Sequence, residues 1–370
     1  MKMLFEIAER FGIDGRVVDV MRHKVGHIND TYIVKSKSGA LQYKYILQRI
    51  NKEVFPKPIA LMDNIKRVTG KIRERVEERG GDPSKEVLNL VNCKDGSHFH
   101  MDDGGQFWRC YQFVEGITID FVEANKRGIE IAHGAAIAFG CFQDDLKDID
   151  ISEIHATIDD FHNTTVRFEN FLRAVKEDSH ERCKSVMVEI DACMKMEGLK
   201  GTISDRIDSG EIPIRVTHND TKINNIIFEE KNGASPSALC VIDLDTVMPG
   251  SILYDFGDLV RTTTASSAED ERDLSKVNFD LGLFEALVCG YIKNGRELIT
   301  IEEMQLLSIS GRVITFETGL RFLTDYLQGD KYFKIEREDH NLDRARTQFK
   351  LAKCMEDLEG EMVSIVEKYW

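Results

Sequence analysis

The hydrophobic pattern of this chain changes once, near Thr118, and that change restricts the fold more than any other feature of the sequence. Before it, short β-branched and aromatic segments such as "DTYIVKS", "YKYILQRI" and "FWRCYQFVEG" alternate with turns, as in a small sheet. After it, apolar residues recur at helical spacing almost to the C-terminus, interrupted by a strand–loop–strand at 214–243, and we expect helices to resume from about residue 273. We therefore predict an α+β fold in which a small sheet region is joined to a larger helical region.

A chain of 370 residues is long for a single small core, so we expect two lobes. The pattern divides it into an N-terminal lobe at 1–112 and a helical C-terminal lobe at 113–370, which meet near "QFVEG". In the first lobe we predict a long helix over "PIALMDNIKRVTGKIRERVEERGG" and a further strand at "EVLNLVNC". In the second, "SEIHATIDDFHNTTVRFENFLRAV" is one of several predicted helices. A cleft between two lobes is a common place for a ligand.

The composition excludes several classes of protein. With 42% hydrophobic and 31% charged residues, the chain is neither disordered nor fibrous. Its longest apolar runs are too short to span a bilayer, and acids interrupt the N-terminus where a signal peptide would be apolar. We therefore expect a cytoplasmic protein without a membrane partner. The net charge of −15 indicates no basic surface for nucleic acid, although a nucleotide needs only local donors.

The eight cysteines are consistent with a reducing compartment. None forms a CxxC pair, and no cysteine–histidine cluster has the spacing of zinc ligands. Most lie in apolar periodic segments, as Cys240 does in "ALCVID", so we expect reduced thiols rather than a disulfide framework.

Polar side chains gather at the ends of two apolar segments, "VTHNDTKINNIIF" and "ALCVIDLDTVMPG". Asp220 follows the first strand, and Asn225 comes five residues later, which is enough loop for both side chains to face one point. Asp243 ends the next strand and can approach the same point from the other side. An amide oxygen with one or two carboxylates is a hard-oxygen set that suits Mg²⁺. Asp220 then remains free to accept a proton from a hydroxyl group.

This arrangement matches the needs of phosphoryl transfer, which are neutralisation of negative charge and alignment of the nucleophile. The sequence reads H-x-D-x-x-x-x-N, then an apolar strand, then I-D, and Asp243 follows Asp220 by 23 positions (243 − 220). The alternative is that Asp, Asn and Thr collect at strand ends because turns favour them. That alternative accounts for one loop, but poorly for two acids, Asp243 and Asp245, at the end of a strand as apolar as "ALCVI".

Seven segments carry a family resemblance: "GHINDTYIV", "ILQRINKEVFP", "DISEIHATIDDFHNT", "THNDTKINN", "CVIDLDTVMPG", "YDFGDLVRT" and "RFLTDYLQGDKYF". Together they resemble the aminoglycoside phosphotransferase and choline kinase superfamily, and within it the bacterial N-acetylhexosamine 1-kinases. The resemblance implies a protein-kinase-like fold of two lobes, with a nucleotide-binding N-terminal lobe and a catalytic, acceptor-binding C-terminal lobe. It also implies ATP and Mg²⁺ as cofactors and a small-molecule sugar as the acceptor.

Carried over by motif position, the resemblance makes Asp220 the general base and Asn225 and Asp243 the metal ligands. It makes Asp245 either a ligand of a second metal ion or a support behind the first. Two further residues are expected to order the loop that contains the base, His218 and Asp255.

The resemblance places the nucleotide in the N-terminal lobe. The hairpin "VGHINDTY" takes the position of the superfamily's glycine-rich loop but holds a single glycine, Gly26. Arg49 stands where the superfamily offers a lysine to phosphates, and a guanidinium can bind phosphate bidentately; the alternative is a solvated strand arginine. The acid that would pair with it is one of two candidates, Asp63 or Glu53. Backbone groups from Gln112 to Val114 are expected to pair with adenine, and the P-loop sequence is absent.

The acceptor is expected on the predicted helix "ISGRVITFETGLRFLTDYL". Its apolar face carries Phe316, Leu320, Leu323 and Leu327, and its other face carries Glu317, Thr318, Arg321, Thr324 and Asp325. The simplest interpretation of the polar face is solvent exposure with a Glu317–Arg321 pair one turn apart. The resemblance instead makes Arg321, Tyr332 and His27 of the hairpin contacts to the sugar. A neutral polyol needs several such donors and acceptors.

These features leave three alternatives for function. The first is an ATP- and Mg²⁺-dependent kinase for the anomeric hydroxyl of N-acetylglucosamine or N-acetylgalactosamine. The second keeps the fold but takes choline, an amino alcohol, an aminoglycoside or another sugar; a cationic acceptor favours an acidic or aromatic pocket, whereas the acceptor segment carries Arg321. The third is a sulfate-ester hydrolase or a carbohydrate-binding protein, although the sulfatase sequence C/S-x-P-x-R is absent and a binding protein has no use for the Asp220, Asn225 and Asp243 set. The sequence leaves the oligomeric state open.

Overall fold

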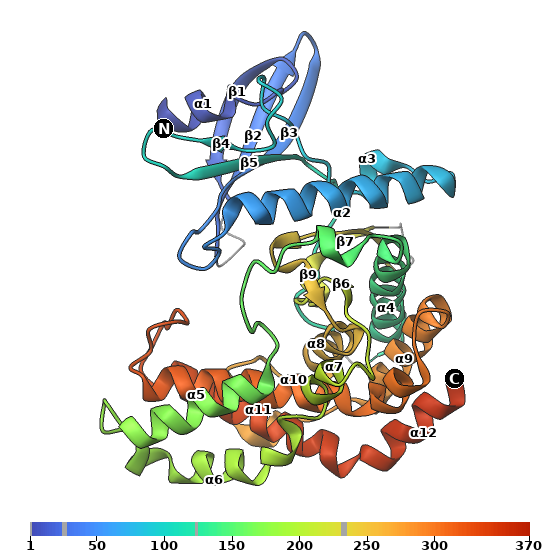
Figure 1. The fold of residues 1–370 in the computed structure, drawn as a ribbon. Helices are drawn as coiled ribbons and strands as arrows, with labels where there is room; N and C mark the ends of the chain where they lie inside the picture. The colour runs from blue at the N-terminus through green and yellow to red at the C-terminus, as the bar shows by residue number, and fades with distance from the viewer. Residues whose placement is uncertain (1, 24–27, 123–124, 231–234) are drawn as a thin grey trace.

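The computed structural model describes residues 2–23, 28–122, 125–230 and 235–370. It confirms the α+β fold, with strands concentrated in the N-terminal part and helices in the C-terminal part (Figure 1). In the view of Figure 1 the long helix α2 (Pro58–Glu78) lies between the sheet above it and the helices below it.

The N-terminal sheet has five antiparallel strands in the order β1-β2-β3-β5-β4. They are β1 (Arg16–Arg22), β2 (Asp30–Ser38), β3 (Leu41–Arg49), β4 (His100–Met101) and β5 (Phe107–Gln112). β2 and β3 pair without a register shift, from Asp30 opposite Arg49 to Ser38 opposite Leu41. The strands predicted from "DTYIVKS", "YKYILQRI" and "FWRCYQFVEG" are therefore confirmed.

Alternate residues of the sheet face two different layers. Leu47 and Cys110 pack in a cluster with residues of α1 (Lys2–Ala8). Ile46 and Tyr111 pack on the other side, in a cluster that contains the buried face of α2 and residues of the C-terminal part. Neighbouring residues of one strand therefore point to opposite sides, and the α2 side faces the rest of the protein.

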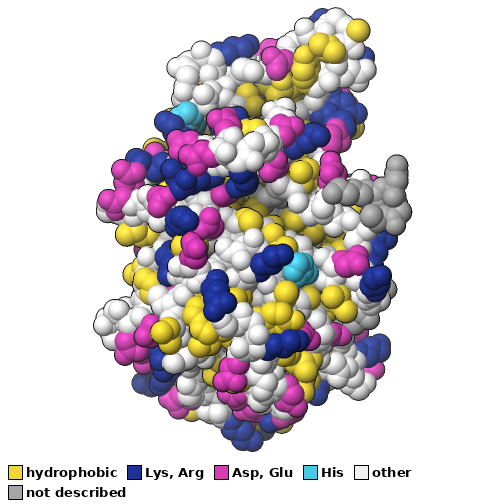
Figure 2. All heavy atoms as spheres, turned by 90° about the vertical axis from the view of Figure 1, so that its right-hand side faces the viewer, with side chains coloured by type: hydrophobic (Ala, Val, Ile, Leu, Met, Phe, Trp, Pro, Cys, Tyr) yellow, Lys and Arg dark blue, Asp and Glu magenta, His cyan; other side chains and the backbone are white. Residues whose placement is uncertain are grey.

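The helix α2 ties the sheet to the helical part through charged as well as apolar contacts. Two of its arginines and Arg79, which caps its C-terminal end, pair with acids further along the chain: Arg67–Glu153, Arg75–Asp148 and Arg79–Asp145. The short helix α3 (Pro83–Glu86) follows it. On the face drawn in Figure 2, acidic and basic side chains are interspersed, and the described residues of that face form no continuous basic patch.

The C-terminal part is built mainly from helices. They are α4 (Lys126–Leu146), α5 (Thr164–Glu177), α6 (Met187–Lys195), α7 (Ser204–Asp208), α8 (Ile252–Thr264), α9 (Leu281–Gly295), α10 (Ile301–Leu327), α11 (His340–Asp357) and α12 (Glu359–Tyr369). Helix α10 packs against α5, α8 and α11. Its predicted apolar face is confirmed, because all four of its residues are 0% exposed: Phe316, Leu320, Leu323 and Leu327.

Two short sheets interrupt these helices, as the strand–loop–strand pattern predicts. β6 (Arg215–Thr217) pairs with β9 (Met248–Gly250), and β7 (Ile226–Glu229) pairs with β8 (Ser237–Val241). The connections between them are called here the 218–225 loop and the 242–247 loop. Each loop runs from one two-stranded sheet to the other.

The segment "EVLNLVNC" is not the strand that its pattern predicts. Isolated bridges hold it beside its neighbours, namely Leu90–Tyr111 and Phe11–Cys93. The Asn89 side chain donates to the carbonyls of Pro83, in α3, and of Val87, both at 2.8 Å, and such local side-chain bonds compete with regular ladder bonds.

Two helix boundaries also differ from the prediction. α5 starts at Thr164 rather than near Ser152, because the Asn163 side chain caps it by accepting from the Val166 amide. Helices resume at α8, earlier than the expected position near residue 273, because the Ser251 side chain caps its first turn.

The structure also bears on the predictions about cysteines and membranes. All eight cysteines lie within the described residues and are free thiols. Within the described ranges, none of the helices combines the length and the apolar composition that crossing a bilayer requires.

Candidate active site

The pairing of β7 with β8 brings two predicted metal ligands together. Ile226 lies opposite Val241, and the next amide along, that of Ile242, donates to the Asn225 carbonyl at 2.9 Å. Asn225 precedes β7 and Asp243 follows Ile242, so strand register makes them neighbours. The structure therefore places both residues at one end of this two-stranded sheet.

Asp220 lies within hydrogen-bond distance of Asn225 and Lys222. The Asn225 Nδ2 group donates to the Asp220 carbonyl at 2.8 Å and to its Oδ2 at 3.1 Å. The Lys222 Nζ lies 2.7 Å from Oδ1. Burial would raise the pKa of Asp220, but the Lys222 ammonium and its hydrogen bond outweigh burial and lower the pKa to about 2. Asp220 is therefore ionised at neutral pH and can accept a hydrogen bond from a hydroxyl group.

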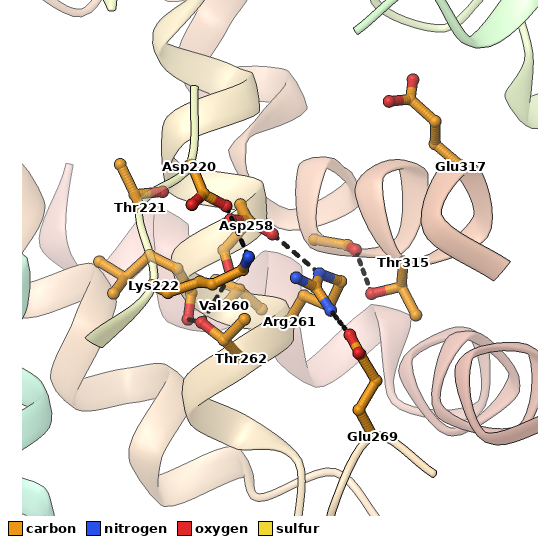
Figure 3. Close-up of polar contacts among 12 residues, drawn as sticks. Asp220, Thr221, Lys222, Asp258, Val260, Arg261, Thr262, Glu269, Thr315 and Glu317 are labelled. Carbon is orange, nitrogen blue, oxygen red and sulfur yellow. Dashed lines mark hydrogen bonds and ion pairs between the residues drawn. The ribbon is translucent and has the colours of Figure 1, made fainter. Parts of the chain in front are cut away.

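Lys222, in the 218–225 loop, lies beside charged residues of α8 (Figure 3). Its side chain and that of Asp220 point toward one another near Asp258 and Arg261. Arg261 pairs with Asp258 at 2.8 Å and with Glu269 at 2.9 Å. Burial would lower the pKa of Lys222, but the attraction of Asp220 and Asp258 outweighs burial and raises it. Lys222 is therefore an ammonium beside the predicted base.

Asp243 differs from Asp220 because its carboxylate has no partner. It is exposed, and it makes no hydrogen bond or ion pair with the described residues. Its backbone is left-handed, with φ at 61°, a conformation that is uncommon for residues other than glycine and most accessible to Asn and Asp. Although solvent reaches the carboxylate, the surrounding protein and the charges of Asp245 and Asp220 raise its pKa to about 6. A cation at this position would favour the ionised form.

The oxygen donors at this place fit Mg²⁺. The Asn225 Nδ2 group is used by Asp220, which leaves the amide oxygen for another partner. This oxygen and the Asp243 carboxylate are hard ligands, and Mg²⁺ commonly takes one or two carboxylates and completes its octahedron with waters and phosphate oxygens. In the described ranges, no three His, Cys, Asp or Glu side chains are grouped so as to hold a metal ion. The Asn225 and Asp243 oxygens would leave the rest of an Mg²⁺ octahedron to water and phosphate oxygens, so the site suits a metal ion that arrives with a phosphate group.

Asp245, the second acid of the same strand end, is placed differently from Asp243. It is 3% exposed, and both of its carboxylate oxygens have donors. Arg109 of β5 donates to Oδ1, and Asn29, just before β2, donates to Oδ2 at 2.6 Å. The Asp245 side chain therefore contacts the N-terminal sheet.

His218 and Asp255 hold the 218–225 loop from two sides. Asp255 of α8 accepts hydrogen bonds from the amides of His218 at 3.0 Å and Asn219 at 2.6 Å. The His218 Nδ1 accepts from the Asp220 amide at 3.3 Å, and Nε2 donates to the Ile242 carbonyl at 3.0 Å. These two bonds assign the neutral tautomer with the proton on Nε2. His218 thus joins the 218–225 loop to the 242–247 loop.

The geometry argues against the phosphate contact predicted for Arg49. Its guanidinium binds Asp30 of β2, with Nε 2.9 Å from Oδ2. The preceding residue, Gln48, points to the α2 side, where its Oε1 accepts from Arg109 at 2.9 and 3.0 Å. Strand residues alternate between faces, so Arg49 points away from the 242–247 loop, whereas Gln48 and Arg109 point toward it. Gln48, one place before Arg49, is therefore the residue of β3 that points toward the 242–247 loop.

The remaining predictions for the N-terminal lobe are tested only in part. Gly26 and His27 lie outside the described residues, so their contacts stay predictions. Of the acids considered as partners of Arg49, Asp63 binds Arg67 at 3.2 Å instead, and Glu53 is exposed in the turn after β3.

The predicted adenine-binding segment already uses two of its amides. The Gln112 amide donates to the Asn89 carbonyl at 2.9 Å, and the Phe113 amide donates to the Lys44 carbonyl at 3.1 Å. Val114 is 7% exposed and makes no backbone–backbone hydrogen bond within the described part of the chain. A ligand that pairs with this segment would therefore use the backbone of Val114 rather than the Gln112 amide.

Arg321 and Tyr332, the predicted sugar contacts, lie together among aromatic rings. The guanidinium carbon of Arg321 lies 5.9 Å from the centre of the Tyr332 ring. It lies 5.7 Å from that of Phe161 and 5.5 Å from that of Phe333, within the range of cation–π attraction. Arg321 makes no hydrogen bond or ion pair with the residues that the structure describes. Its donors are therefore available to a ligand.

A second arginine, Arg167 of α5, lies in the same neighbourhood. Its Nη2 donates to the Phe161 carbonyl at 3.2 Å, while its buried Nε has no partner among the described residues. Burial and the charge of Arg321 lower the pKa of Arg167. Two guanidinium groups with unused donors therefore flank the rings, and like charge would oppose the binding of a cation here.

Glu317 is not the solvated partner of Arg321 that helical spacing suggests. It is 1% exposed and accepts hydrogen bonds from His162 at 2.9 Å and Thr164 at 2.6 Å. The other ring nitrogen of His162 donates to the Asn219 carbonyl at 2.9 Å. Because both nitrogens face acceptors, the ring is an imidazolium; burial would lower its pKa, but the Glu317 carboxylate raises it. The pair connects α10 to the 218–225 loop.

Sequence reasoning missed four of the residues described here, Lys222, His162, Arg109 and Asn29. Lys222 carried a signal, since it lies two positions after Asp220 in a loop of polar residues. His162 and Asn29 lie in segments that carry the family resemblance, "DISEIHATIDDFHNT" and "GHINDTYIV", but no role was predicted for either, and nothing in the strand that contains Arg109 marks it.

The chain matches the model of the phosphotransferase enzyme family over residues 19–282, and it belongs to this family. The match includes both the 218–225 loop and the 242–247 loop. The coarser part of the predicted identity, a phosphotransferase, is therefore confirmed.

Solved structures share the fold across almost the whole chain. An aminoglycoside phosphotransferase from Alicyclobacillus acidocaldarius has a TM-score of 0.63 and 13% identity, over 98% of this chain and 96% of the other. A microcompartment-associated aminopropanol kinase has a TM-score of 0.57 and 11% identity, over 98% of both chains. A choline kinase from Cryptosporidium parvum has a TM-score of 0.55 and 12% identity, over 100% of this chain and 99% of the other. At these identities the similarity shows the protein-kinase-like fold alone.

Proposed function

We propose that this protein transfers the γ-phosphoryl group of ATP to the anomeric hydroxyl of an N-acetylhexosamine, with Mg²⁺ as the required cation. The convergence of Asp220, Asn225 and Asp243 carries the proposal, because two carboxylates and an amide oxygen at one place are the parts that phosphoryl transfer needs. The family match supports the chemistry. The motifs that resemble N-acetylhexosamine 1-kinases support the acceptor.

In this proposal Asp220 is the general base. Its carboxylate accepts the proton of the acceptor hydroxyl while the hydroxyl oxygen bonds to the γ-phosphorus and the bond to the bridging oxygen of ADP breaks. Lys222, 2.7 Å from that carboxylate, can offset negative charge on the transferred group. Bound Mg²⁺ supplies stabilisation of the phosphate charge, and Asn225 and Asp243 would hold it.

The acceptor side of the site favours a neutral polyol. Arg321 offers unused donors to hydroxyl or acetamido oxygens, and the neighbouring rings can pack on the apolar face of a sugar. Arg167 and Arg321 would repel the ammonium group of choline or of an amino alcohol. The alternative is a kinase for another small alcohol, since the fold is shared with an aminopropanol kinase and a choline kinase.

Phosphorus NMR tests both the transfer and the position of the phosphate. The protein is incubated with ATP, Mg²⁺ and either N-acetylglucosamine or N-acetylgalactosamine, and Asp220→Asn serves as the control. We expect ADP and a phosphomonoester signal coupled to the anomeric proton. Phosphate on another carbon would contradict the position. ADP release with choline or an amino alcohol but with neither hexosamine would favour the alternative acceptor class.

A further inference from the structure

We propose that Asp245 is a joint between the N-terminal sheet and the 242–247 loop, through which Arg109 and Asn29 position Asp243, and that it is not a metal ligand. The inference rests on the phosphotransferase function proposed above. It concerns how the metal-binding loop is held in register with the nucleotide-binding sheet.

The two oxygens of Asp245 are already bound by donors from the sheet. Arg109 donates to Oδ1, and Asn29 donates to Oδ2 at 2.6 Å. The Arg109 and Asp245 side chains are only 2% and 3% exposed, so removing either partner would leave the other one buried and unpaired. The guanidinium also repels any second cation that approaches the same oxygens. We therefore expect a metal ion at Asp243 and none at Asp245.

Arg109 is itself fixed by neighbouring strands. Its Nε and Nη2 donate to the Gln48 Oε1 at 3.0 and 2.9 Å, and the Gln48 Nε2 donates to Thr31 at 3.1 Å. Three strands, β2, β3 and β5, thus hold one guanidinium. Asn29 in turn accepts the Asn51 amide at 2.9 Å. The joint therefore ties the ends of β2 and β3 to the 242–247 loop.

Helix α2 fastens the other end of the same loop. Asn64, 1% exposed, donates to the Val247 carbonyl at 3.0 Å. The loop is thus held at Asp245 and Val247, whereas Asp243 has no side-chain partner of its own in the described structure. The position of Asp243 depends on these neighbours, and a displacement of about 1 Å in a catalytic group can lower turnover by about 10²-fold.

Binding of ADP in the presence and absence of Mg²⁺ distinguishes a joint from a metal ligand without turnover. Calorimetric titrations compare the wild type, Asp243→Asn and Asp245→Asn. We expect Asp243→Asn to abolish the strengthening of ADP binding by Mg²⁺ and Asp245→Asn to reduce it only in part, because Asp243 is then displaced but still present. Complete loss of the Mg²⁺ effect in both variants would overturn the proposal, because Asp245 would then act as a ligand.

A double-mutant cycle tests the joint itself. Arg109→Met and Asp245→Asn should each lower kcat by about 10–100-fold, and the double variant should be no worse than the more damaged single variant. Arg79→Met breaks another arginine–aspartate pair between the two parts of the protein, Arg79–Asp145 at 2.8 Å, and should leave kcat unchanged. Additive losses, or an equal loss in Arg79→Met, would overturn the proposal.

An alternative variant and an alternative measurement apply if the first experiments fail. If Arg109→Met does not fold, Arg109→Lys takes its place in the cycle and must show the same non-additivity with Asp245→Asn. A wild-type protein that binds no ADP would contradict the proposed function instead. The joint is then judged by urea unfolding of the same variants, in which additive stability losses would overturn it.

Discussion

The two sides of the 218–225 loop are held by different kinds of contact. On the metal side, the neutral imidazole of His218 and the register of β7 with β8 place Asn225. On the acceptor side, the buried charged pair of His162 and Glu317 reaches the Asn219 carbonyl. Strand register and a neutral imidazole therefore place Asn225, whereas a histidine–carboxylate ion pair fixes the connection to the acceptor helix α10.

The metal side carries the backbone strain of the site. Asn219 and Asp243 both have left-handed backbones, with φ at 63° and 61°. Residues in this conformation persist only where the surroundings hold them, and here the Asp255 carboxylate and strand pairing do so. Because the acceptor side depends on the charge of a histidine, the two sides should respond differently to mutation and to pH.

The largest effects are expected from the carboxylates on the metal side. Asp220→Asn should lower kcat by about 10²–10⁴-fold, because the general base is lost. Asp243→Asn should lower it at least as far and should also weaken ATP binding when Mg²⁺ is present. Steady-state kinetics with both substrates, with circular dichroism as the folding control, measure this. Near-normal turnover in Asp220→Asn would remove it from the role of base.

The next largest effect is expected on the stability of the protein, from Glu317 on the acceptor side. Glu317→Gln keeps the shape of the side chain but removes the charge that faces His162 and Thr164, so it should cost about 1–3 kcal/mol of stability at pH 6. Urea unfolding of the wild type and the variant at pH 6 and pH 9 measures the cost at each pH. The difference between them should shrink at pH 9.

The sign of this pH dependence follows from the pKa shifts of His162 and Glu317. Burial would lower the pKa of His162, but Glu317 raises it above 6.5, so its contribution is present below pH 6.5 and is lost as the pH rises through the folded pKa. Burial would raise the pKa of Glu317, but His162 lowers it below 4.5, so that contribution is lost only in acid. The pair is therefore most stabilising between these values.

A matched control lies on the same helix. Glu303 is buried and pairs with Arg215, a pair that contains no histidine. Glu303→Gln should destabilise the protein equally at pH 6 and pH 9. Equal behaviour of the Glu317 and Glu303 variants would mean that His162 carries no charge.

The metal side could be predicted from the sequence because its chemistry is local. Asp220 and Asn225 lie in one loop, and the strand patterns on either side of it are clear. The acceptor side could not, since His162 is 155 positions from Glu317 and lies in a segment whose spacing predicts a helix. Helical spacing identifies neighbours along one helix, which is why it suggested Arg321 as the partner of Glu317.

The N-terminal sheet shows a second limit of prediction from the sequence, which concerns the two faces of a strand. The strand that contains Arg49 was predicted correctly, but its spacing alone does not say which face meets α1 and which meets α2. That choice decides whether Arg49 or Gln48 points to the 242–247 loop. The Arg109–Asp245 pair, 136 positions apart, depends on the same choice.

A smaller effect is expected from Arg321, which contacts aromatic rings but no described hydrogen-bond partner. Arg321→Met should raise the acceptor KM by about 10–100-fold, the cost of a charged hydrogen bond, and leave the ATP KM unchanged. The matched control is Arg296→Met, whose guanidinium lies 5.4 Å from the Trp370 ring at the end of α9. An unchanged acceptor KM in the Arg321 variant would show that the guanidinium does not touch the acceptor.

The smallest effect is expected from Arg49, and it tests the assignment of the two sheet faces. Arg49→Met removes an exposed pair with Asp30, which typically contributes less than about 1 kcal/mol. Because Arg49 points away from the 242–247 loop, the ATP KM should change by less than about twofold, within the range of exposed substitutions. Kinetics with ATP as the varied substrate measure it. A large rise in the ATP KM would mean that phosphates approach the sheet from the face opposite to Gln48 and Arg109, and the joint at Asp245 would then lie on the wrong side of the nucleotide.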